Sequence, residues 1–334
     1  MDIIIGIVGF GNVGQGLARV LLDRGYKIDH GFRAIIRYII DPVKGSVFHR
    51  EGVNLEAALR EVYQGNPLDK ALGYNTIPTF NDLIEDDDVD VVIEATPTNL
   101  VDGEPGYTHI SKALDRGKHV ITTNKGPIAL NYINLRRKAE SKGLYLGIEG
   151  TVMSGTPLIR LIQQSLDPSD IKAIEGILNG TTNYILTLME EGLTFEESLS
   201  NAKEKGYAEA DPSMDVNGWD LAAKASILAT IVKGVQIAPD NIHRESLARY
   251  ITENGFTEGL KYVVTLDFEQ EVFRVEPRIF SKDHPLRRVS GVNNKVVIHH
   301  KMLGEIGLEG PGAGRIETGY AILTDLIELV RSHM

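Results

Sequence analysis

Residues 2–14, DIIIGIVGFGNVG, decide the fold of this chain. The apolar run Ile3–Val8 is typical of a strand that is buried on both faces. It leads directly into a Gly-x-Gly-x-x-Gly loop formed by Gly9, Gly11 and Gly14, after which apolar residues recur at helical spacing. A strand, this loop and a helix in that order predict a dinucleotide-binding site.

Each glycine of the loop has a physical reason to be there. Gly9 permits the tight turn, Gly11 lets the backbone approach a pyrophosphate, and Gly14 allows the helix to pack closely on the strand. The free N–H groups of the helix N-terminus then face the phosphates. The alternative is a glycine-rich turn without a ligand. We expect the loop to bind NAD or NADP through five residues: Gly9, Gly11, Asn12, Val13 and Gly14.

A second strand is expected over residues 33–40, and it ends at Asp41. An acid at that position can accept hydrogen bonds from the adenosine ribose, which favours NAD. The alternative for Asp41 is a turn residue before Pro42. Four basic residues in or just after this strand can instead meet a 2′-phosphate, so the sequence leaves NAD against NADP open: Arg37, Lys44, His49 and Arg50.

Further Val/Ile-rich strands are expected at residues 89–95, 119–123 and 144–148, and helical stretches near residues 55–63, 107–116 and 132–141. This alternation predicts an α/β fold with a doubly wound parallel Rossmann sheet. Ligands of such sheets lie beyond the carboxyl ends of the strands. Two polar segments fall there, residues 96–99 and 122–127. Lys125 in the second segment is poorly placed for an ordinary surface lysine, so a site role is preferred over a salt bridge.

Residues 206–224, GYAEADPSMDVNGWDLAAK, concentrate acidic side chains before a helix that begins near Trp219. Asp220 and Lys224 are four residues apart and project from one face of that helix. Spacing alone favours a solvated salt bridge, which is worth only about 0.3–0.5 kcal/mol. The preceding nucleotide loop makes a functional pair the better interpretation.

Alternating patterns over residues 261–268, 271–279 and 295–302 predict a largely antiparallel sheet with one solvated face. Before this sheet, Thr156 as cap and Pro157 as first residue are expected to start a helix, and Thr194 with Glu197 predicts a capping box for another. Residues 171–178 between them are strand-like and end in Asn179. With these elements, the sheet predicts a second, α+β domain for substrate binding and dimerisation. A glycine-rich turn at residues 310–315 and a final helix suggest that the chain returns to the nucleotide domain. The expected domains are 1–150 completed by 310–334, and 151–309.

Composition excludes several classes of protein. The 334 residues carry a net charge of −11, which argues against a nucleic-acid binder. The chain has no cysteine, so disulfides and cysteine nucleophiles are impossible. The N-terminus lacks the pattern of a secretory signal, and no apolar run reaches the ~18–20 residues that span a bilayer. We expect a cytoplasmic protein without membrane segments.

With these motifs in view, the chain resembles the homoserine dehydrogenases over essentially its full length. The resemblance rests on GFGNVG, ATPTN, TTNKGP, EGTVMSGTP, GILNGTTNYIL, GYAEADPSMDVNGWDLAAK and GPGAGRIETGYAILTDL. One departure is Gly319, where the family usually has alanine after threonine. The chain resembles the short, monofunctional form, which lacks a kinase portion and a regulatory domain.

The resemblance implies a reaction and a set of site residues. The reaction is the reversible NAD(P)-dependent interconversion of L-homoserine and L-aspartate 4-semialdehyde in threonine, methionine and isoleucine biosynthesis. Lys224 matches the acid/base lysine, Asp220 its acidic partner that holds substrate, and Glu209 a substrate-binding carboxylate. Lys125 matches a lysine between nicotinamide and substrate, with a catalytic part.

The resemblance further implies cofactor contacts at Thr96 and Gly314, a homodimer, and a structural monovalent cation, commonly sodium. The residues matching the cation site are Glu149, Val152, Ser154 and Thr156. Three alternatives differ in what they require. An aldehyde-oxidising, phosphorylating dehydrogenase needs a cysteine nucleophile, and another hydroxy-acid or amino-acid dehydrogenase does not explain GILNGTTNYIL. A noncatalytic dinucleotide-sensing protein keeps the glycine loop but does not need Asp220, Lys224 and Lys125 to converge.

Overall fold

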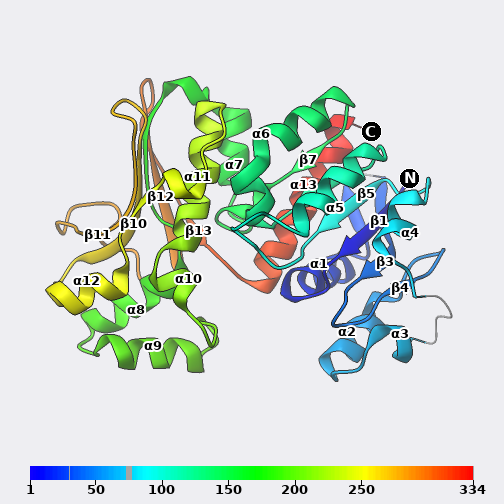
Figure 1. The fold of residues 1–334 in the computed structure, drawn as a ribbon, viewed down its shortest axis with the longest axis horizontal. Coiled ribbons are helices and arrows are strands. Elements are labelled where there is room, and N and C mark those ends of the chain that lie inside the picture. The colour runs from blue at the N-terminus through cyan, green and yellow to red at the C-terminus, as the bar shows by residue number, and fades with distance from the viewer. Residues whose placement is uncertain (30, 73–76, 334) are drawn as a thin grey trace. The chain divides into compact units, whose positions relative to one another are not determined.

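The computed structural model describes residues 1–29, 31–72 and 77–333. Met334, the last residue of the expected first domain, lies outside them. The chain divides into two compact units, Met1–Gly155 with Gly314–Met334, and Thr156–Ala313. Each unit contains one sheet and its own helices (Figure 1).

The first unit is a doubly wound α/β domain, as predicted. Its seven strands pair in the order β2-β3-β1-β5-β6-β7, with β4 on β3. Strands β3, β1, β5, β6 and β7 run parallel, whereas β2 and β4 are antiparallel to β3. The strands are β1 Asp2–Val8, β2 Lys27–Asp29, β3 Phe32–Ile40, β4 Val47–Phe48, β5 Val91–Glu94, β6 His119–Thr122 and β7 Leu146–Gly147.

Helices cover this sheet and complete its core. They are α1 Asn12–Asp23, α2 Leu55–Tyr63, α3 Leu68–Ala71, α4 Phe80–Glu85, α5 Gly106–Asp115, α6 Lys125–Ser141 and α13 Arg315–His333, with the short helix η1 Glu149–Thr151. The last helix, α13, lies beside α1 (Figure 1). Glycines permit this approach, because a Cβ at Gly16 would overlap the carbonyl oxygen of Arg315 and a Cβ at Gly319 the backbone of Gly16.

The second unit is built on a six-stranded sheet with the order β13-β12-β8-β10-β11-β9. All its pairs are antiparallel except β9 with β11, which confirms the prediction for the main strands. The strands are β8 Ile171–Ile177, β9 His243–Arg244, β10 Leu260–Asp267, β11 Val272–Ile279, β12 Asn293–His300 and β13 Gly304–Pro311. Helix α11 packs on β10 and β11 and presents an almost wholly buried surface.

The other elements of the second unit are helical. They are α7 Leu158–Arg160, η2 Leu161–Ser165, η3 Pro168–Asp170, α8 Gly180–Glu190, α9 Phe195–Glu204, α10 Ser213–Val216, α11 Trp219–Lys233, η4 Pro239–Asn241 and α12 Leu247–Asn254. The capping box that Thr194 and Glu197 predict at the start of α9 is confirmed. Strand β13 was not expected, because its glycines and acids hide the alternating pattern.

Two helix starts differ from the sequence-based expectation. Thr156 does not cap α7; its hydroxyl donates to the carbonyl oxygen of Pro311 at 3.2 Å, and Pro157 occupies the cap position. Helix α6 begins at Lys125 rather than near Tyr132, because Asn124 caps it by accepting from the Gly126 N–H at 3.1 Å. The backbone is non-helical at Asn131, which divides α6 where the expected helix would begin.

Candidate functional site

The glycine loop after β1 is shaped partly by protein packing and partly by space left open. Gly9 has a φ of +96°, and a Cβ there would overlap the carbonyl group of Ala95. A Cβ at Gly14 would lie 2.5 Å from the Gly9 carbonyl oxygen. A Cβ at Gly11, in contrast, would meet no atom within 4 Å. Packing therefore explains Gly9 and Gly14. Gly11 instead borders open space, where the phosphates of a ligand can approach the loop backbone.

The N-terminus of α1 suits an anion. Gly11 occupies the cap position without a side-chain hydrogen bond, and the first turn contains no acidic residue. The partial positive charge of the helix end is therefore not neutralised locally. Arg315 adds a full positive charge at this helix end. Its Nη2 donates to Oδ1 of Asn12, the first residue of α1, at 2.8 Å. The sequence-based prediction missed Arg315, whose only signal was its place directly after Gly314. Loop, helix end and guanidinium fit the diphosphate of a dinucleotide.

Asp41 fastens the glycine loop to the turn that follows β3. Its Oδ2 accepts from the N–H of Phe10 at 2.7 Å, and its Oδ1 accepts from the N–H of Val43 at 2.8 Å and of Lys44 at 2.7 Å. The residue is buried, with 8% of its surface exposed. These contacts give Asp41 a structural function in the loop. Its role toward the cofactor ribose stays a prediction.

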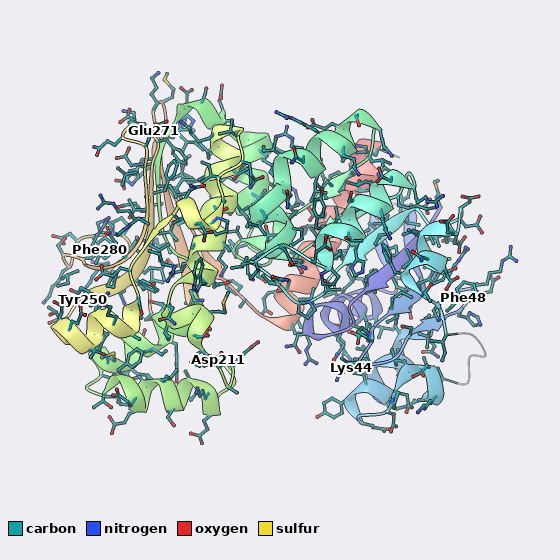
Figure 2. The ribbon with its side chains drawn as sticks, in the orientation of Figure 1. Lys44, Phe48, Asp211, Tyr250, Glu271 and Phe280 are labelled. Carbon is teal, nitrogen blue, oxygen red and sulfur yellow. The ribbon has the colours of Figure 1, made fainter. Side chains whose placement is uncertain are left out.

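The basic residues near this turn differ in their surroundings. Arg37 is buried and forms ion pairs with Asp86 at 3.0 Å and Asp88 at 3.1 Å. Its charge is therefore already balanced inside the protein. Lys44 lies on the turn after β3, where Figure 2 labels it. Lys44 is therefore better placed than Arg37 for a 2′-phosphate.

Lys125 is the first residue of α6, directly after the carboxyl end of β6. Its neighbour Asn124 is buried and donates through Nδ2 to the Thr96 hydroxyl at 3.3 Å. Thr96 itself follows the end of β5, the neighbouring strand. The structure thus brings Thr96 and Lys125 to the same edge of the parallel sheet, which is the ligand-binding edge of doubly wound folds.

In the second unit, Lys224 is part of a buried polar cluster. Its Nζ lies 2.8 Å from Oδ2 of Asp220 and donates to the carbonyl oxygen of Leu178 at 2.6 Å. Only 7% of Lys224 is exposed, although α11 is otherwise packed in apolar core. An exposed i,i+4 pair would be an ordinary surface salt bridge; this burial makes that interpretation untenable.

Asn179 holds the acids of this cluster, and sequence reasoning missed its role. Its Nδ2 donates to Asp215 Oδ1 at 2.7 Å and to Asp220 Oδ2 at 2.9 Å. Its Oδ1 accepts from the Thr182 N–H at 2.9 Å and so caps α8. A backbone N–H can only donate, so the amide orientation is fixed. The signal was present in the sequence, since Asn179 ends a predicted strand and precedes Gly180.

Glu209 and Gly314 lie in exposed segments. Glu209 belongs to the loop between α9 and α10, which also contains the exposed Asp211 labelled in Figure 2. Gly314 precedes α13 with a φ of +140°, a value that glycine adopts more readily than other residues. The predicted roles of both residues stay predictions.

The residues expected to bind a monovalent cation are all buried. Glu149, Val152 and Ser154 belong to the first unit, and Thr156 begins the second. Glu149 donates its N–H to Asp325 Oδ2 at 3.1 Å, and Ser154 shares a 2.7 Å hydrogen bond with Thr318. Ser154 has a φ of +51°, which is uncommon for a residue with a side chain. The Glu149 carboxylate and the backbone carbonyl oxygens at the other three positions are ligands of the type that a hard cation requires, and the site itself stays a prediction.

Two features are absent from the part of the chain that the structure describes. Over those residues, no helix combines the length and the apolar character that crossing a membrane demands. The same residues form no group of three or more histidine, aspartate or glutamate side chains able to bind a metal ion.

Comparison with protein families gives two matches that together cover most of the chain. The homoserine dehydrogenase profile matches residues 157–327, and the profile of the homoserine dehydrogenase NAD-binding domain matches residues 9–149. An NAD(+)-dependent homoserine dehydrogenase of Pseudomonas canavaninivorans is 38% identical over 98% of this chain and 96% of its own. The homoserine dehydrogenase of Methanocaldococcus jannaschii is 37% identical over 99% of both chains.

Solved structures of similar proteins agree with these matches. A hyperthermophilic archaeal homoserine dehydrogenase in complex with NADPH superposes with a TM-score of 0.87 at 30% identity, covering 99% of this chain and 98% of that one. A putative homoserine dehydrogenase from Archaeoglobus fulgidus gives 0.83 at 34% identity, covering 98% and 99%. The similarity therefore extends through both units.

Proposed function

The chain belongs to the homoserine dehydrogenase family, and we propose that Lys224 is the acid/base of its reaction, with Asp220 as its acidic partner. The protein catalyses the reversible NAD(P)-dependent interconversion of L-homoserine and L-aspartate 4-semialdehyde. The observation that carries the proposed roles is the buried Lys224–Asp220 pair, with a 2.8 Å separation between Nζ and Oδ2. A noncatalytic dinucleotide sensor would have no need for this pair.

The cluster fits the chemical requirement of the reaction. The nicotinamide, when bound, exchanges a hydride with the carbon that bears the reacting oxygen. The protein must hold that oxygen and exchange a proton with it. Two N–H bonds of Lys224 point to Leu178 and Asp220 in the described contacts, which leaves the third for the substrate oxygen. The ammonium then donates the proton in reduction and stabilises the developing alkoxide charge.

The acids of the cluster suit the ammonium group of the substrate. Asp220 is held by Lys224 and Asn179, and Asp215 by Asn179. Glu209 adds a carboxylate in the exposed loop before α10. For the substrate α-carboxylate, the start of α8 supplies donors, because helix N-termini attract anions. The Thr182 N–H is already used by Asn179, so the N–H groups of Gly180 and Thr181 are the proposed donors.

Lys125 is proposed to act beside the nicotinamide in catalysis and substrate binding, and Thr96 and Gly314 to contact the cofactor. The glycine-loop residues Gly9, Gly11, Asn12, Val13 and Gly14 are proposed to hold the diphosphate. Support comes from the open space at Gly11 and from the position of Lys125 after β6. Asp41 is proposed to bind the adenosine ribose of NAD. Lys44 is the proposed partner of the 2′-phosphate where the cofactor is NADP.

The test is an assay of nicotinamide absorbance with L-homoserine, run in parallel with NAD and with NADP. The Pseudomonas relative is named for NAD(+), and the archaeal structure contains NADPH, so each cofactor has a precedent. Homoserine-dependent reduction of one nucleotide is expected. Absence of reduction with both would contradict the activity, and cofactor binding without reduction would support a sensing protein.

Sodium is the proposed occupant at Glu149, Val152, Ser154 and Thr156, with the Glu149 carboxylate and backbone carbonyls as ligands; the burial of all four residues supports this proposal. Replacing sodium chloride with choline chloride at constant ionic strength should lower the thermal midpoint if the cation is structural. An unchanged midpoint over a titration from cation-free buffer would contradict the site.

We further propose a homodimer in the cytoplasm, with Met1–Gly155 and Gly314–Met334 as the nucleotide domain and Thr156–Ala313 as the catalytic and dimerisation domain. The six-stranded sheet of the second unit offers the surface for self-association. Light scattering should give twice the mass of 36.7 kDa. A monomeric mass at assay concentration would contradict the dimer.

A further inference from the structure

A closed ring of hydrogen bonds joins the carboxyl ends of β5 and β6. Glu94, the last residue of β5, accepts through Oε1 from the N–H of Thr96 at 3.1 Å and from the Thr96 hydroxyl. The Thr122 hydroxyl donates to Glu94 in a shared contact, with Oε2 at 3.0 Å and the backbone carbonyl oxygen at 2.9 Å. Thr122 Oγ1 accepts in turn from the Asn124 N–H at 3.0 Å, and Asn124 Nδ2 donates to Thr96 at 3.3 Å. The ring therefore returns to the residue from which it began.

The carboxylate at its centre is fully buried. Glu94 and Thr122 have no exposed surface, and Asn124 has 2%. The partners described for Glu94 are hydroxyls and a backbone N–H, with the Nδ1 atom of His109 3.7 Å away. A Cβ added to Gly106, the first residue of α5, would lie 3.3 Å from Oε2, so the carboxylate lies near the positive end of that helix.

Stability alone does not explain an acid at this position. Burying a carboxylate opposes folding unless its oxygens are well satisfied, and a neutral residue would fill the same space with a smaller penalty. Residues that break such a rule are expected at functional sites. The ring lies at the edge where a doubly wound sheet binds its ligand, on the β5–β6 side of β1.

The segment after Glu94 is also confined from both sides. A Cβ at Gly9 would overlap the carbonyl group of Ala95 and lie 2.9 Å from the Thr96 nitrogen. A Cβ at Gly126, in the first turn of α6, would overlap the backbone of Asn99. The glycine loop, the Thr96 segment and the start of α6 therefore form one packed assembly. Glu94 supplies the polar contacts that fix its middle.

We propose that Glu94 is a positioning residue for the nicotinamide half of the cofactor site. Its carboxylate fixes the Thr96 hydroxyl directly and, through Thr122 and Asn124, the start of α6 that carries Lys125. This inference rests on the proposed placement of the cofactor along the ends of β5 and β6. It assigns Glu94 no contact with substrate or with the reacting atoms.

The test is the Glu94→Gln variant, which keeps the size of the side chain but replaces one acceptor oxygen with a donor. Binding is measured by fluorescence titration with NADH and with NADPH, so the readout does not depend on turnover. We expect the dissociation constant to rise about tenfold, the scale of one lost hydrogen bond to a charged group. The KM for homoserine, measured at saturating cofactor, should change far less.

Asp90→Asn is the matched control. Asp90 immediately precedes β5 at its amino end, where its Oδ2 accepts from the Ile4 N–H at 2.7 Å and burial raises the pKa of its carboxyl group. This variant likewise converts a partly buried acid of the first unit into its amide, but at the opposite end of β5 from the ring, so it should leave cofactor affinity unchanged. An equal loss of affinity in Asp90→Asn would show that Glu94 acts through stability alone and would overturn the proposal.

A double-mutant cycle tests the route through Thr96. If Glu94 acts by holding that hydroxyl, Glu94→Gln added to Thr96→Val should weaken binding little beyond Thr96→Val alone. Should Glu94→Gln fail to fold, Thr122→Val, which removes another hydroxyl of the ring, must raise the dissociation constant instead. Wild-type affinity in the folded variant overturns the proposal. Failure of the wild-type protein to bind either nucleotide contradicts the cofactor assignment, not Glu94.

Discussion

The Nδ2 atom of Asn179 lies 2.9 Å from Oδ2 of Asp220, and this hydrogen bond connects the cap of α8 to the first turn of α11. The same nitrogen donates to Asp215 at 2.7 Å. One amide therefore orders two carboxylates whose negative charges repel each other. Through Asp220 it also fixes the environment of Lys224, the proposed acid/base.

Asn179→Asp separates this ordering role from helix capping. The new carboxylate still accepts from the Thr182 N–H, so the α8 cap remains, but it places a third negative charge against Asp215 and Asp220. We expect kcat/KM for homoserine to fall at least tenfold. The thermal midpoint should change little, because the cap is retained. The control is Thr194→Ala, which removes the α9 cap, worth about 1 kcal/mol, and should leave kcat/KM intact. Equal activity in Asn179→Asp and wild type would contradict the ordering role.

Lys224→Ala should lower turnover by roughly 10²–10⁴-fold, the usual contribution of general acid–base catalysis. Cofactor affinity should hardly change, because the residue lies in the second unit and the glycine loop in the first. Steady-state rates and NAD(P)H titration measure the two effects separately. The control is Lys233→Ala on the same helix, whose ion pair with Glu271 is at the surface. Turnover close to wild type in Lys224→Ala would remove the acid/base assignment.

Arg315→Ala should weaken cofactor binding about tenfold, because a charge-assisted contact with the diphosphate and the bond to Asn12 are both lost. Arg331→Ala is the control on the same helix, because Arg331 forms an ion pair at 2.7 Å with Asp29 of β2 and not with the glycine loop. Its affinity should equal that of wild type. Titration at two salt concentrations checks the charge, because the loss should shrink as salt rises. Unchanged affinity in Arg315→Ala would contradict a diphosphate contact.

Gly16→Ala should destabilise the first unit by about 1–3 kcal/mol, as overpacking of a close contact does. The added methyl group would overlap the Arg315 carbonyl and force α1 and α13 apart. Gly307→Ala is the control, because a Cβ there meets no atom within 4 Å. Urea unfolding should show a lower midpoint for the first variant only. A wild-type midpoint in Gly16→Ala would show that the two helices adjust without strain.

Acid should destabilise the first unit through His119. Burial, reinforced by the neighbouring His333, lowers the pKa of His119 from 6.5 to about 4. Below pH 6.5 the unfolded chain binds a proton that the folded protein does not, so stability falls as the pH drops from 6.5 toward 4. At pH 8 both states are neutral at this residue, and its contribution is constant.

His119→Asn should reduce this loss. The Asn side chain retains an acceptor for the Tyr145 N–H, which donates to Nδ1 at 2.9 Å, but it does not titrate. The fall in thermal midpoint between pH 8 and pH 5 should therefore be smaller in the variant than in wild type. His243→Asn, at an exposed histidine of the second unit, serves as the control. Equal falls in His119→Asn and wild type would exclude His119 as the source of acid sensitivity.

The sequence by itself determined the main elements of the fold class and the family. Strand β1, the glycine loop and α1 follow from a local pattern, because a buried parallel strand must be apolar and the turn after it must accept a positive φ at Gly9. The i,i+4 spacing of Asp220 and Lys224 likewise placed them together, since helix geometry alone sets that contact. The motifs were sufficient to predict the fold class and the homoserine dehydrogenase activity.

Only the tertiary structure decided what surrounds those residues. Whether the Asp220–Lys224 pair is exposed or buried depends on β10 and β11, on which α11 packs, and on Leu178, 46 residues before Lys224. Asn179 meets Asp220 across 41 residues, and Arg315 meets Asn12 across 303. Such contacts arise from packing between elements, and no local periodicity encodes them. For the same reason, the sequence showed Glu94 only as part of an apolar strand. The hydrogen bonds from Thr96 and Thr122 to its carboxylate appear only in the folded chain.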